Sequence, residues 1–274
     1  MTRNIPVNQN LVDMEYAVRG AIPRRAQEMQ REGRTIYSCN LGNPQALGQK
    51  PITFYRQVLA LLEAASNIPR ERSLTRVAVA NPELFKEGGV TPLSDYIIDY
   101  SANFIDQCRT GMGAYTESKG PLFIREAIAR YIDLRDGENI AADPEQILLT
   151  DGASDAVKRI MELLITGPQD GVMIPIPQYP LYSATVKRCG GVQVNYYPEE
   201  ENDWALTPDT LEESYQKAIA DGVQVQCIVM INPGNPTGAI LDKPSINGVV
   251  NFAEQHGLVI IADEVYQDNL YGGT

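Results

Sequence analysis

The chain has 274 residues, of which 43% are hydrophobic and 21% are charged, the composition of an ordinary globular protein. That length suffices for one large domain, or for one domain and part of another. The formal net charge of −12 repels phosphate backbones and anionic lipids, so we expect neither nucleic-acid binding nor attachment to a membrane surface.

The cysteines, the single histidine and the first residues of the chain argue against a metal site and against secretion. The four cysteines are widely spaced without any CxxC pair, and His256 is the single histidine, so we expect no metal site. Scattered thiols are typical of a reducing compartment. The first residues contain no apolar signal region, and no segment approaches the roughly 18–20 apolar residues that cross a bilayer. The expected location is therefore cytoplasmic.

The first half of the chain has an irregular pattern. Helical periodicity predicts helices over residues 13–33, 54–66, 95–108 and 121–135. A short strand is expected over residues 35–39. Residues 67–95 are rich in Pro, Gly, Arg and Glu, and we expect surface turns there with one short helix.

From about residue 145, apolar strands alternate with helices. Strands are predicted over residues 146–149, 172–176, 192–197, 223–231 and 258–262. Helices are predicted over residues 156–164, 181–188, 207–220 and 245–256. Nearly all-apolar strands separated by helices indicate an α/β protein whose parallel sheet is covered on both faces. In such folds ligands bind beyond the carboxyl ends of the strands.

Two of these predicted strands end in residues suited to a ligand with an anion and a flat ring. The strand predicted over residues 146–149 is followed by residues 150–155, which begin a helix. Their small side chains and the Ser154 hydroxyl favour the binding of an anion there. A simple helix N-cap explains that stretch equally well. The second is followed by Tyr179 between prolines, which could stack on a heterocycle or only cap the core.

Two later strands end in an amide and an acid. The turn NPGNPTG at 232–238 presents Asn235 directly after a long buried strand. Asp263 and Tyr266 follow the next strand, and a carboxylate at that position costs free energy unless a cation meets it. A lone acid there is often an N-cap, but two such strand ends in adjacent units favour a binding site.

In order and spacing, NPGNPTG and the following ADEVY at 262–266 resemble the class I/II aminotransferases of pyridoxal-phosphate (PLP) fold type I. With GAYTESKGPLFIREAIARYI, TDGASDA and PIPQYPLYSAT, about residues 14–271 are most similar to alanine aminotransferases. The resemblance implies an incomplete large PLP-binding domain over residues 96–274, mostly parallel sheet with helices on both faces. Residues 1–95 would be an N-terminal arm and part of the small domain, and the C-terminal domain would be absent.

The resemblance implies how four of these residues meet the cofactor ring. Asp263 would face the pyridine nitrogen, where a carboxylate favours the protonated ring, the better electron sink. Asn235 and Tyr266 would donate hydrogen bonds to the phenolate oxygen of the ring. Tyr179 would stack on its face.

Five further residues are implied at the phosphate and the substrate. Ala153, Ser154 and Asp155 would hold the phosphate at a helix N-terminus. Tyr115 matches a tyrosine that reaches the phosphate across a dimer interface. Gly42 matches a glycine beside the substrate, where a side chain would obstruct the amino acid.

The implied reaction moves an amino group between an amino acid, in particular alanine, and a 2-oxo acid such as 2-oxoglutarate or pyruvate. That reaction needs a Schiff-base lysine. No lysine lies between Tyr266 and Thr274, and Lys243 is expected to be a solvated helix-start residue. We therefore expect the catalytic lysine beyond Thr274, and a fragment that is inactive alone and homodimeric only at full length.

The sequence also allows three other interpretations. A different fold type I PLP reaction, such as a lyase or decarboxylase reaction, would share the cofactor contacts. A non-catalytic fragment that binds PLP weakly or not at all is also open. A nicotinamide-dinucleotide domain is disfavoured, because no G-x-G-x-x-G motif follows a predicted strand.

Overall fold

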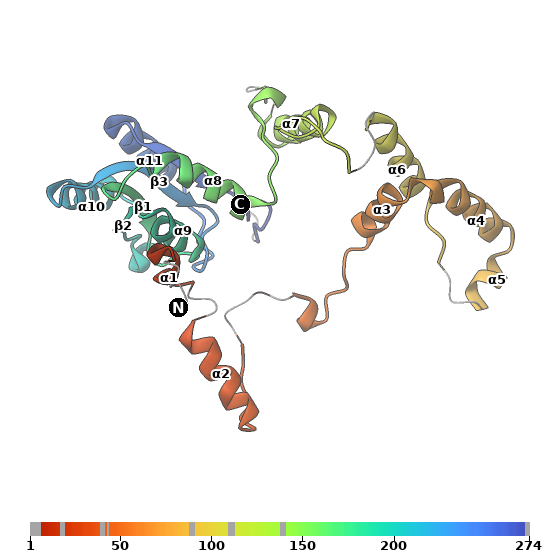
Figure 1. The fold of residues 1–274 in the computed structure, drawn as a ribbon, viewed down its shortest axis with the longest axis horizontal. Helices are drawn as coiled ribbons and strands as arrows, with labels where there is room; N and C mark the ends of the chain where they lie inside the picture. Colours follow the sequence, from red (N-terminus) through yellow and green to blue (C-terminus); the bar gives the residue numbers. More distant parts are fainter. Residues whose placement is uncertain are drawn as a thin grey trace, which may run out of the picture. The chain divides into compact units, whose positions relative to one another are not determined.

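The computed structural model describes residues 7–16, 20–38, 42, 44–87, 91–108, 113–137 and 141–271 (Figure 1). It divides into two compact units. The first unit comprises Met1–Leu41 and Thr150–Thr274, and the second comprises Gly42–Leu149. The breaks do not fall at residue 95, and the division into a small and a large domain at that residue stays a prediction.

The first unit is built on a four-stranded parallel sheet in the order β2-β1-β3-β4. Its strands are β1 (Asp170–Pro175), β2 (Val192–Tyr196), β3 (Gln224–Ile231) and β4 (Val259–Asp263). Every residue of β1 is buried, as is the second half of β3, because these central strands are covered on both faces. The parallel sheet predicted from the apolar runs is thus confirmed.

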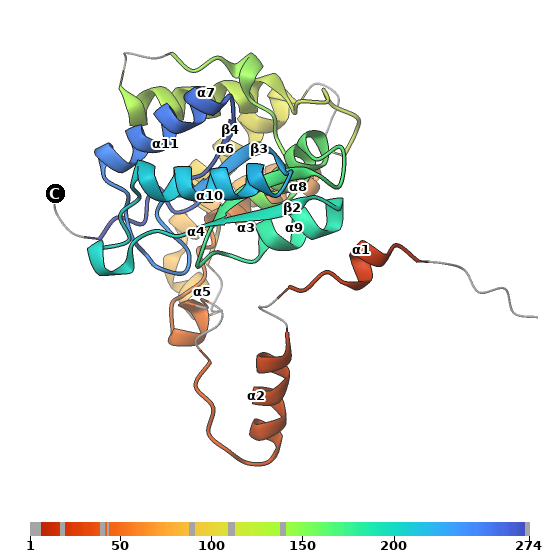
Figure 2. The ribbon, with the colours of Figure 1, turned by 90° about the vertical axis from the view of Figure 1, so that its left-hand side faces the viewer.

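Two pairs of helices cover the two faces of this sheet (Figure 2). The first pair is α8 (Ala153–Leu164) with α9 (Leu181–Cys189), and the second is α10 (Pro208–Ala220) with α11 (Lys243–His256). Because side chains alternate along a strand, Val172 and Ile174 pack under α8 and α9 while Met173 packs under α10 and α11. The predicted α/β class, with helices on both faces, is confirmed.

The N-terminal part of the first unit holds two helices, α1 (Gln9–Val12) and α2 (Ala21–Arg31). The helix expected over residues 13–33 is therefore shorter than predicted: residues 13–16 are not helical, and residues 17–19 lie outside the described residues. Pro23 explains the late start, since proline is tolerated in the first turn of a helix but not in its interior.

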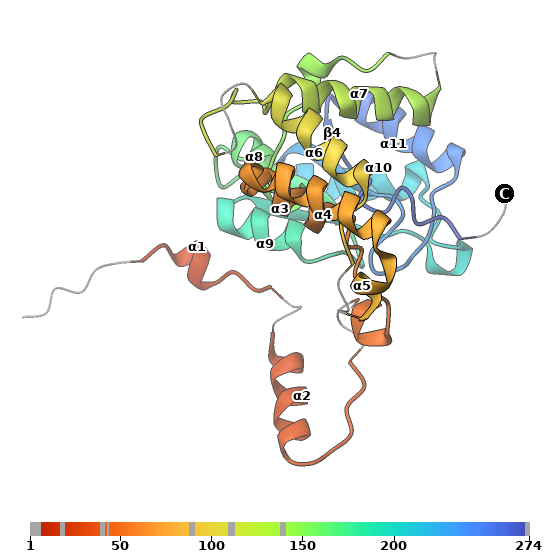
Figure 3. The same cartoon turned by 90° about the vertical axis from the view of Figure 1, so that its right-hand side faces the viewer.

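Among the described residues of the second unit, the regular secondary structure is helical and loops connect the helices (Figure 3). Its helices are α3 (Phe54–Glu63), α4 (Ile68–Ala80), α5 (Pro82–Glu87), α6 (Asp95–Gln107) and α7 (Leu122–Asp136). A small core joins Val58, Leu61 and Leu62 of α3 to Ile97 and Ile98 of α6. Short 3-10 helices occur across both units at Pro44–Leu47, Ala65–Asn67, Pro144–Gln146 and Glu200–Asn202.

Three local predictions are wrong. Residues 146–149 are not a strand: Leu149 N donates to Lys119 O at 2.9 Å, and a strand requires a neighbouring strand that local sequence does not reveal. Residues 35–38 are not a strand either, and residue 39 lies outside the described residues. Within the described part of residues 67–95 there are two helices, α4 and α5, where one short helix is predicted. Pro69 does not prevent α4, because it lies in the first turn, where its missing N–H costs nothing.

Across the described parts of the chain, we find no helix long and apolar enough to cross a bilayer.

Candidate functional site

Asp263 is the last residue of β4, and its half-buried carboxylate is held from two sides. Oδ2 accepts a hydrogen bond from the Tyr182 hydroxyl, and Oδ1 accepts one from Val265 N at 3.1 Å. The residues after Asp263 form a turn and not a helix, so this acid is no helix N-cap. The two donors fix the orientation of a carboxylate at the carboxyl edge of the sheet, where ligands bind in such folds.

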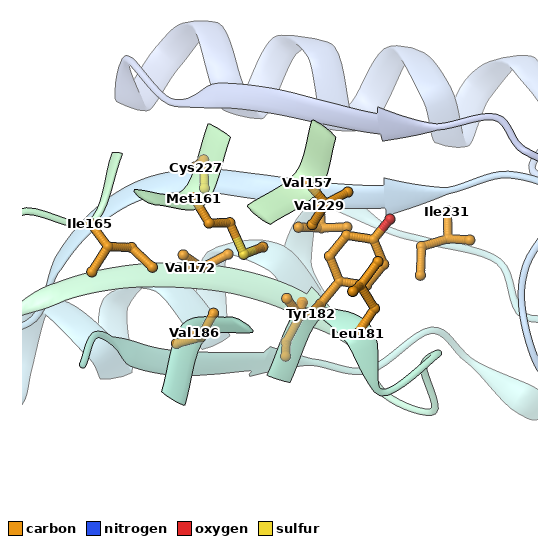
Figure 4. Packing of buried hydrophobic residues seen from close by; sticks show 11 residues of the cluster. Val157, Met161, Ile165, Val172, Leu181, Tyr182, Val186, Cys227, Val229 and Ile231 are labelled. Atoms are coloured by element: carbon orange, nitrogen blue, oxygen red, sulfur yellow. The ribbon is translucent and has the colours of Figure 1, made fainter. Parts of the chain in front are cut away.

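Tyr182 is a residue that the sequence reasoning missed. It lies in the first turn of α9, is 0% exposed, and belongs to the core cluster under α8 and α9 (Figure 4). Burial, together with its hydrogen bond to Asp263, raises the pKa of the Tyr182 phenol well above its usual range. It therefore stays a neutral donor to the carboxylate. The available signal was a phenol hydroxyl on the buried, mostly apolar face of a helix.

Asn235 and Tyr266 come together as the sequence reasoning expected. Asn235 Nδ2 donates to Tyr266 Oη at 3.3 Å, across the edge formed by the ends of β3 and β4. The turn that carries Asn235 is closed by Gly234 N bonding to Ala239 O at 2.8 Å. A Cβ on Gly234 would lie 2.5 Å from Thr237 Oγ1, so a larger residue at that position would displace the Thr237 side chain, whose Oγ1 accepts from Ala239 N.

The N-terminus of α8 carries the three predicted phosphate residues. Ala153 is its first residue, and Gly152 stands at the N-cap position without a side chain to accept from the first-turn amides. Asp155 accepts a hydrogen bond from Arg159 Nε at 2.8 Å, which lowers the pKa of this carboxyl group. The charge of Asp155 is therefore offset within its own helix. Asp155 N already donates to Gly152 O at 3.0 Å, so the amides that suit an anion are those of Ala153 and Ser154.

Tyr179 follows β1 and is half-buried. Its ring packs against the core cluster that contains Tyr182, so part of its role is to cap the core. Its hydroxyl accepts a hydrogen bond from Tyr16 Oη at 2.6 Å. The two ring centroids lie 6.2 Å apart at an interplanar angle of 83°, an edge-on contact.

The remaining two predicted residues lie in the second unit. The side chain of Tyr115 is 100% exposed. Its loop is fastened to α7 by Arg125, which donates to Gly120 O at 2.9 Å and to Glu117 Oε2 at 2.6 Å. Gly42 is exposed, and a Cβ there would meet no atom of the described residues within 4 Å. How both approach the first unit stays a prediction.

The chemistry of the polar groups in the first unit fits pyridoxal phosphate. An oriented carboxylate suits a protonated pyridine nitrogen, an amide and a phenol suit a phenolate oxygen, and an uncapped helix N-terminus suits a phosphate. Tyr16 and Ser154 line one cavity, and Tyr16 bonds Tyr179, which connects the predicted phosphate and ring residues. The individual roles stay predictions.

Comparison with known proteins assigns the family. The family model described as "Aminotransferase class I and II" matches residues 69–274, so the chain belongs to this family. It is 41% identical over 265 residues to glutamate–glyoxylate aminotransferase 2 of Arabidopsis thaliana, covering 97% of this chain and 51% of that protein. It is 40% identical over 277 residues to alanine aminotransferase 1 of Homo sapiens, with 97% and 51% covered. The chain thus spans about half the length of the curated relatives it matches.

Solved structures agree on the fold. An aminotransferase from Escherichia coli matches with a TM-score of 0.63 at 25% identity, over 96% of this chain and 51% of that one. An alanine aminotransferase from Pyrococcus furiosus matches with a TM-score of 0.67 at 22% identity, over 98% and 54%. The fold is therefore that of the fold type I aminotransferases, and the resemblance to alanine aminotransferases is confirmed.

Proposed function

We propose that this chain carries the cofactor-binding part of a PLP-dependent aminotransferase that moves an amino group between alanine and a 2-oxo acid, 2-oxoglutarate or pyruvate. The observation that carries the proposal is the carboxylate of Asp263 at the sheet edge, oriented by Tyr182. Bound PLP would supply an electron sink for negative charge developing on the α-carbon of the amino acid.

The residues of this chain would prepare that sink. Asp263 would hold a proton on the ring nitrogen, since an adjacent carboxylate favours the cationic form. Tyr182 would keep the carboxylate pointed at the ring. Asn235 Nδ2 and Tyr266 Oη, which lie 3.3 Å apart, would both donate hydrogen bonds to the phenolate oxygen. The first-turn amides of α8 would hold the phosphate.

The substrate proposal rests on the relatives. Alanine aminotransferases of four eukaryotes match at 39–41% identity over 96–98% of this chain. A second candidate is glutamate–glyoxylate transamination, because two such Arabidopsis thaliana enzymes match at 41% identity. Assaying the whole protein with alanine plus 2-oxoglutarate and with glutamate plus glyoxylate distinguishes the two. We also propose that the full-length protein is a cytoplasmic homodimer, in which Tyr115 would reach the phosphate across the dimer interface as the resemblance implies.

Calorimetric titration with pyridoxamine 5′-phosphate tests the cofactor site without relying on a lysine, because this amine forms no imine with protein amines. We expect the chain to bind it, and Asp263→Ala to weaken binding roughly 10- to 150-fold, the range of a charge-assisted hydrogen bond of about 1.5–3 kcal/mol. The control is Asp209→Asn, an exposed acid in the first turn of α10. Equal affinities for Asp263→Ala and this control would contradict the proposal.

A further inference from the structure

The N-terminal segment, defined here as residues 7–16, lies against α9 within the first unit (Figure 1). Asn8 caps its short helix α1 by accepting from Asn10 N at 2.9 Å. The side chain of Asn10 sits beside Gly190, which ends α9 at φ +80°, and a Cβ on Gly190 would lie 2.9 Å from Asn10 Nδ2. The segment therefore fits closely over the end of α9.

The same segment reaches the start of α8. Leu11, Met14 and Tyr16 line a cavity whose other walls include Ser154 of α8 and Leu181 of α9. Ser154 is one of the predicted phosphate residues. The segment thus runs from the C-terminus of α9 toward the site at the carboxyl edge of the sheet.

Its last described residue touches the predicted ring-stacking residue. Tyr16 Oη donates to Tyr179 Oη at 2.6 Å, and the two rings meet edge-on at 83°. Pro177 and Pro180 restrict the backbone around Tyr179, but they leave its side-chain torsions free. Packing against the core cluster holds one side of the Tyr179 ring, and the contact with Tyr16, from 163 positions earlier in the chain, restrains its hydroxyl end.

We propose that Tyr16 is a positioning residue: it holds the ring of Tyr179 in the orientation needed to stack on the cofactor. The part about the cofactor rests on the proposed function, whereas the restraint on Tyr179 does not. A ring that is already ordered loses less side-chain freedom when the cofactor binds, so the N-terminal segment raises affinity without touching the cofactor. Ordering one side chain corresponds to roughly a 2- to 10-fold gain in affinity.

Tyr16→Phe tests this inference, because it keeps the ring and removes the hydroxyl. We expect pyridoxamine 5′-phosphate to bind roughly 2- to 10-fold more weakly, and the circular dichroism induced in the bound cofactor to decrease per bound molecule. The induced signal reports how rigidly the cofactor ring is held, which a purely structural residue would not change. The control is Tyr55→Phe, a substitution at an exposed tyrosine of α3.

A second variant and a cofactor-free measurement keep the two proposals apart. Leu11→Ser should loosen the segment without altering either tyrosine, because it removes an apolar side chain from the cavity and adds no charge that could pair with Lys158 or Arg188. It should shift affinity in the same direction as Tyr16→Phe. Without cofactor, hydrogen exchange of the amides at 178–183 should be faster in Tyr16→Phe than in the control.

Failure of the unmodified chain to bind pyridoxamine 5′-phosphate would overturn the proposed function, and the exchange data alone would then decide on Tyr16. Unchanged exchange in Tyr16→Phe, or unchanged affinity and induced signal in a chain that binds, would overturn the inference.

Discussion

Removing the hydroxyl of Tyr182 tests whether this buried phenol orients Asp263. Tyr182→Phe keeps the ring in its 0%-exposed position, so it leaves no cavity beyond one oxygen atom. A hydrogen bond to a charged group contributes roughly 1.5–3 kcal/mol. Asp263 is only half-buried and retains the Val265 amide as a donor, so water can replace part of the lost bond. We therefore expect the lower part of that range, about 1.5–2 kcal/mol.

Urea unfolding at neutral pH measures this loss. The midpoint should fall while the denaturant dependence of the unfolding free energy stays the same, because the surface exposed on unfolding hardly changes. The control Tyr197→Phe alters a tyrosine that is 56% exposed and should change the unfolding free energy by less than about 0.5 kcal/mol.

Combining Tyr182→Phe with Asp263→Ala should cost less than the sum of the two single losses, since each removes the same bond. Strict additivity, or a Tyr182→Phe loss no greater than that of the control, would refute the reasoning.

Three further predictions concern the two units. Met161→Ala, at a 0%-exposed core position, should lower the unfolding free energy by about 2–5 kcal/mol in urea, and a loss below about 1 kcal/mol would contradict the described packing. Burial raises the pKa of Cys227 from 9.0 to about 12, so the unfolded chain releases this proton first. The unfolding free energy should therefore fall as the pH rises above 9, with a shallower fall in Cys227→Ala. In the second unit, Gly120→Ala should destabilise more than Gly137→Ala in thermal unfolding. Both glycines have positive φ, but a Cβ on Gly120 would also lie 2.4 Å from Leu149 Cδ1. Equal losses of stability in the two variants would show that the Leu149 side chain moves aside at no cost in free energy, and would contradict this prediction.

The second half of the chain could be predicted from sequence because its signals are local. Strands buried on both faces read as apolar runs, so β3 (Gln224–Ile231) and β4 (Val259–Asp263) were predicted to within one residue at each end. Their polar ends marked Asn235 and Asp263 for the same reason. The change from an apolar run to polar residues is visible without any knowledge of distant contacts.

What failed depended on contacts between distant positions. The apolar stretch at 146–149 looks like a strand, but pairing decides strands, and here the backbone bonds a loop at Lys119. Tyr182 was missed because its partner Asp263 lies 81 positions away. Tyr16 was overlooked for the same reason. The roles of Tyr115 and Gly42 came from the resemblance alone, since nothing local distinguishes either residue.

The central claim is that the carboxyl edge of this sheet holds the cofactor ring through Asp263. Nitrogen-15 NMR of pyridoxamine 5′-phosphate labelled at the ring nitrogen tests it most directly. We predict a bound species whose ring nitrogen is protonated in the unmodified chain and loses that proton in Asp263→Ala at the same neutral pH. A bound ring nitrogen with the same protonation in both proteins, or no bound species in the unmodified chain, would contradict the account.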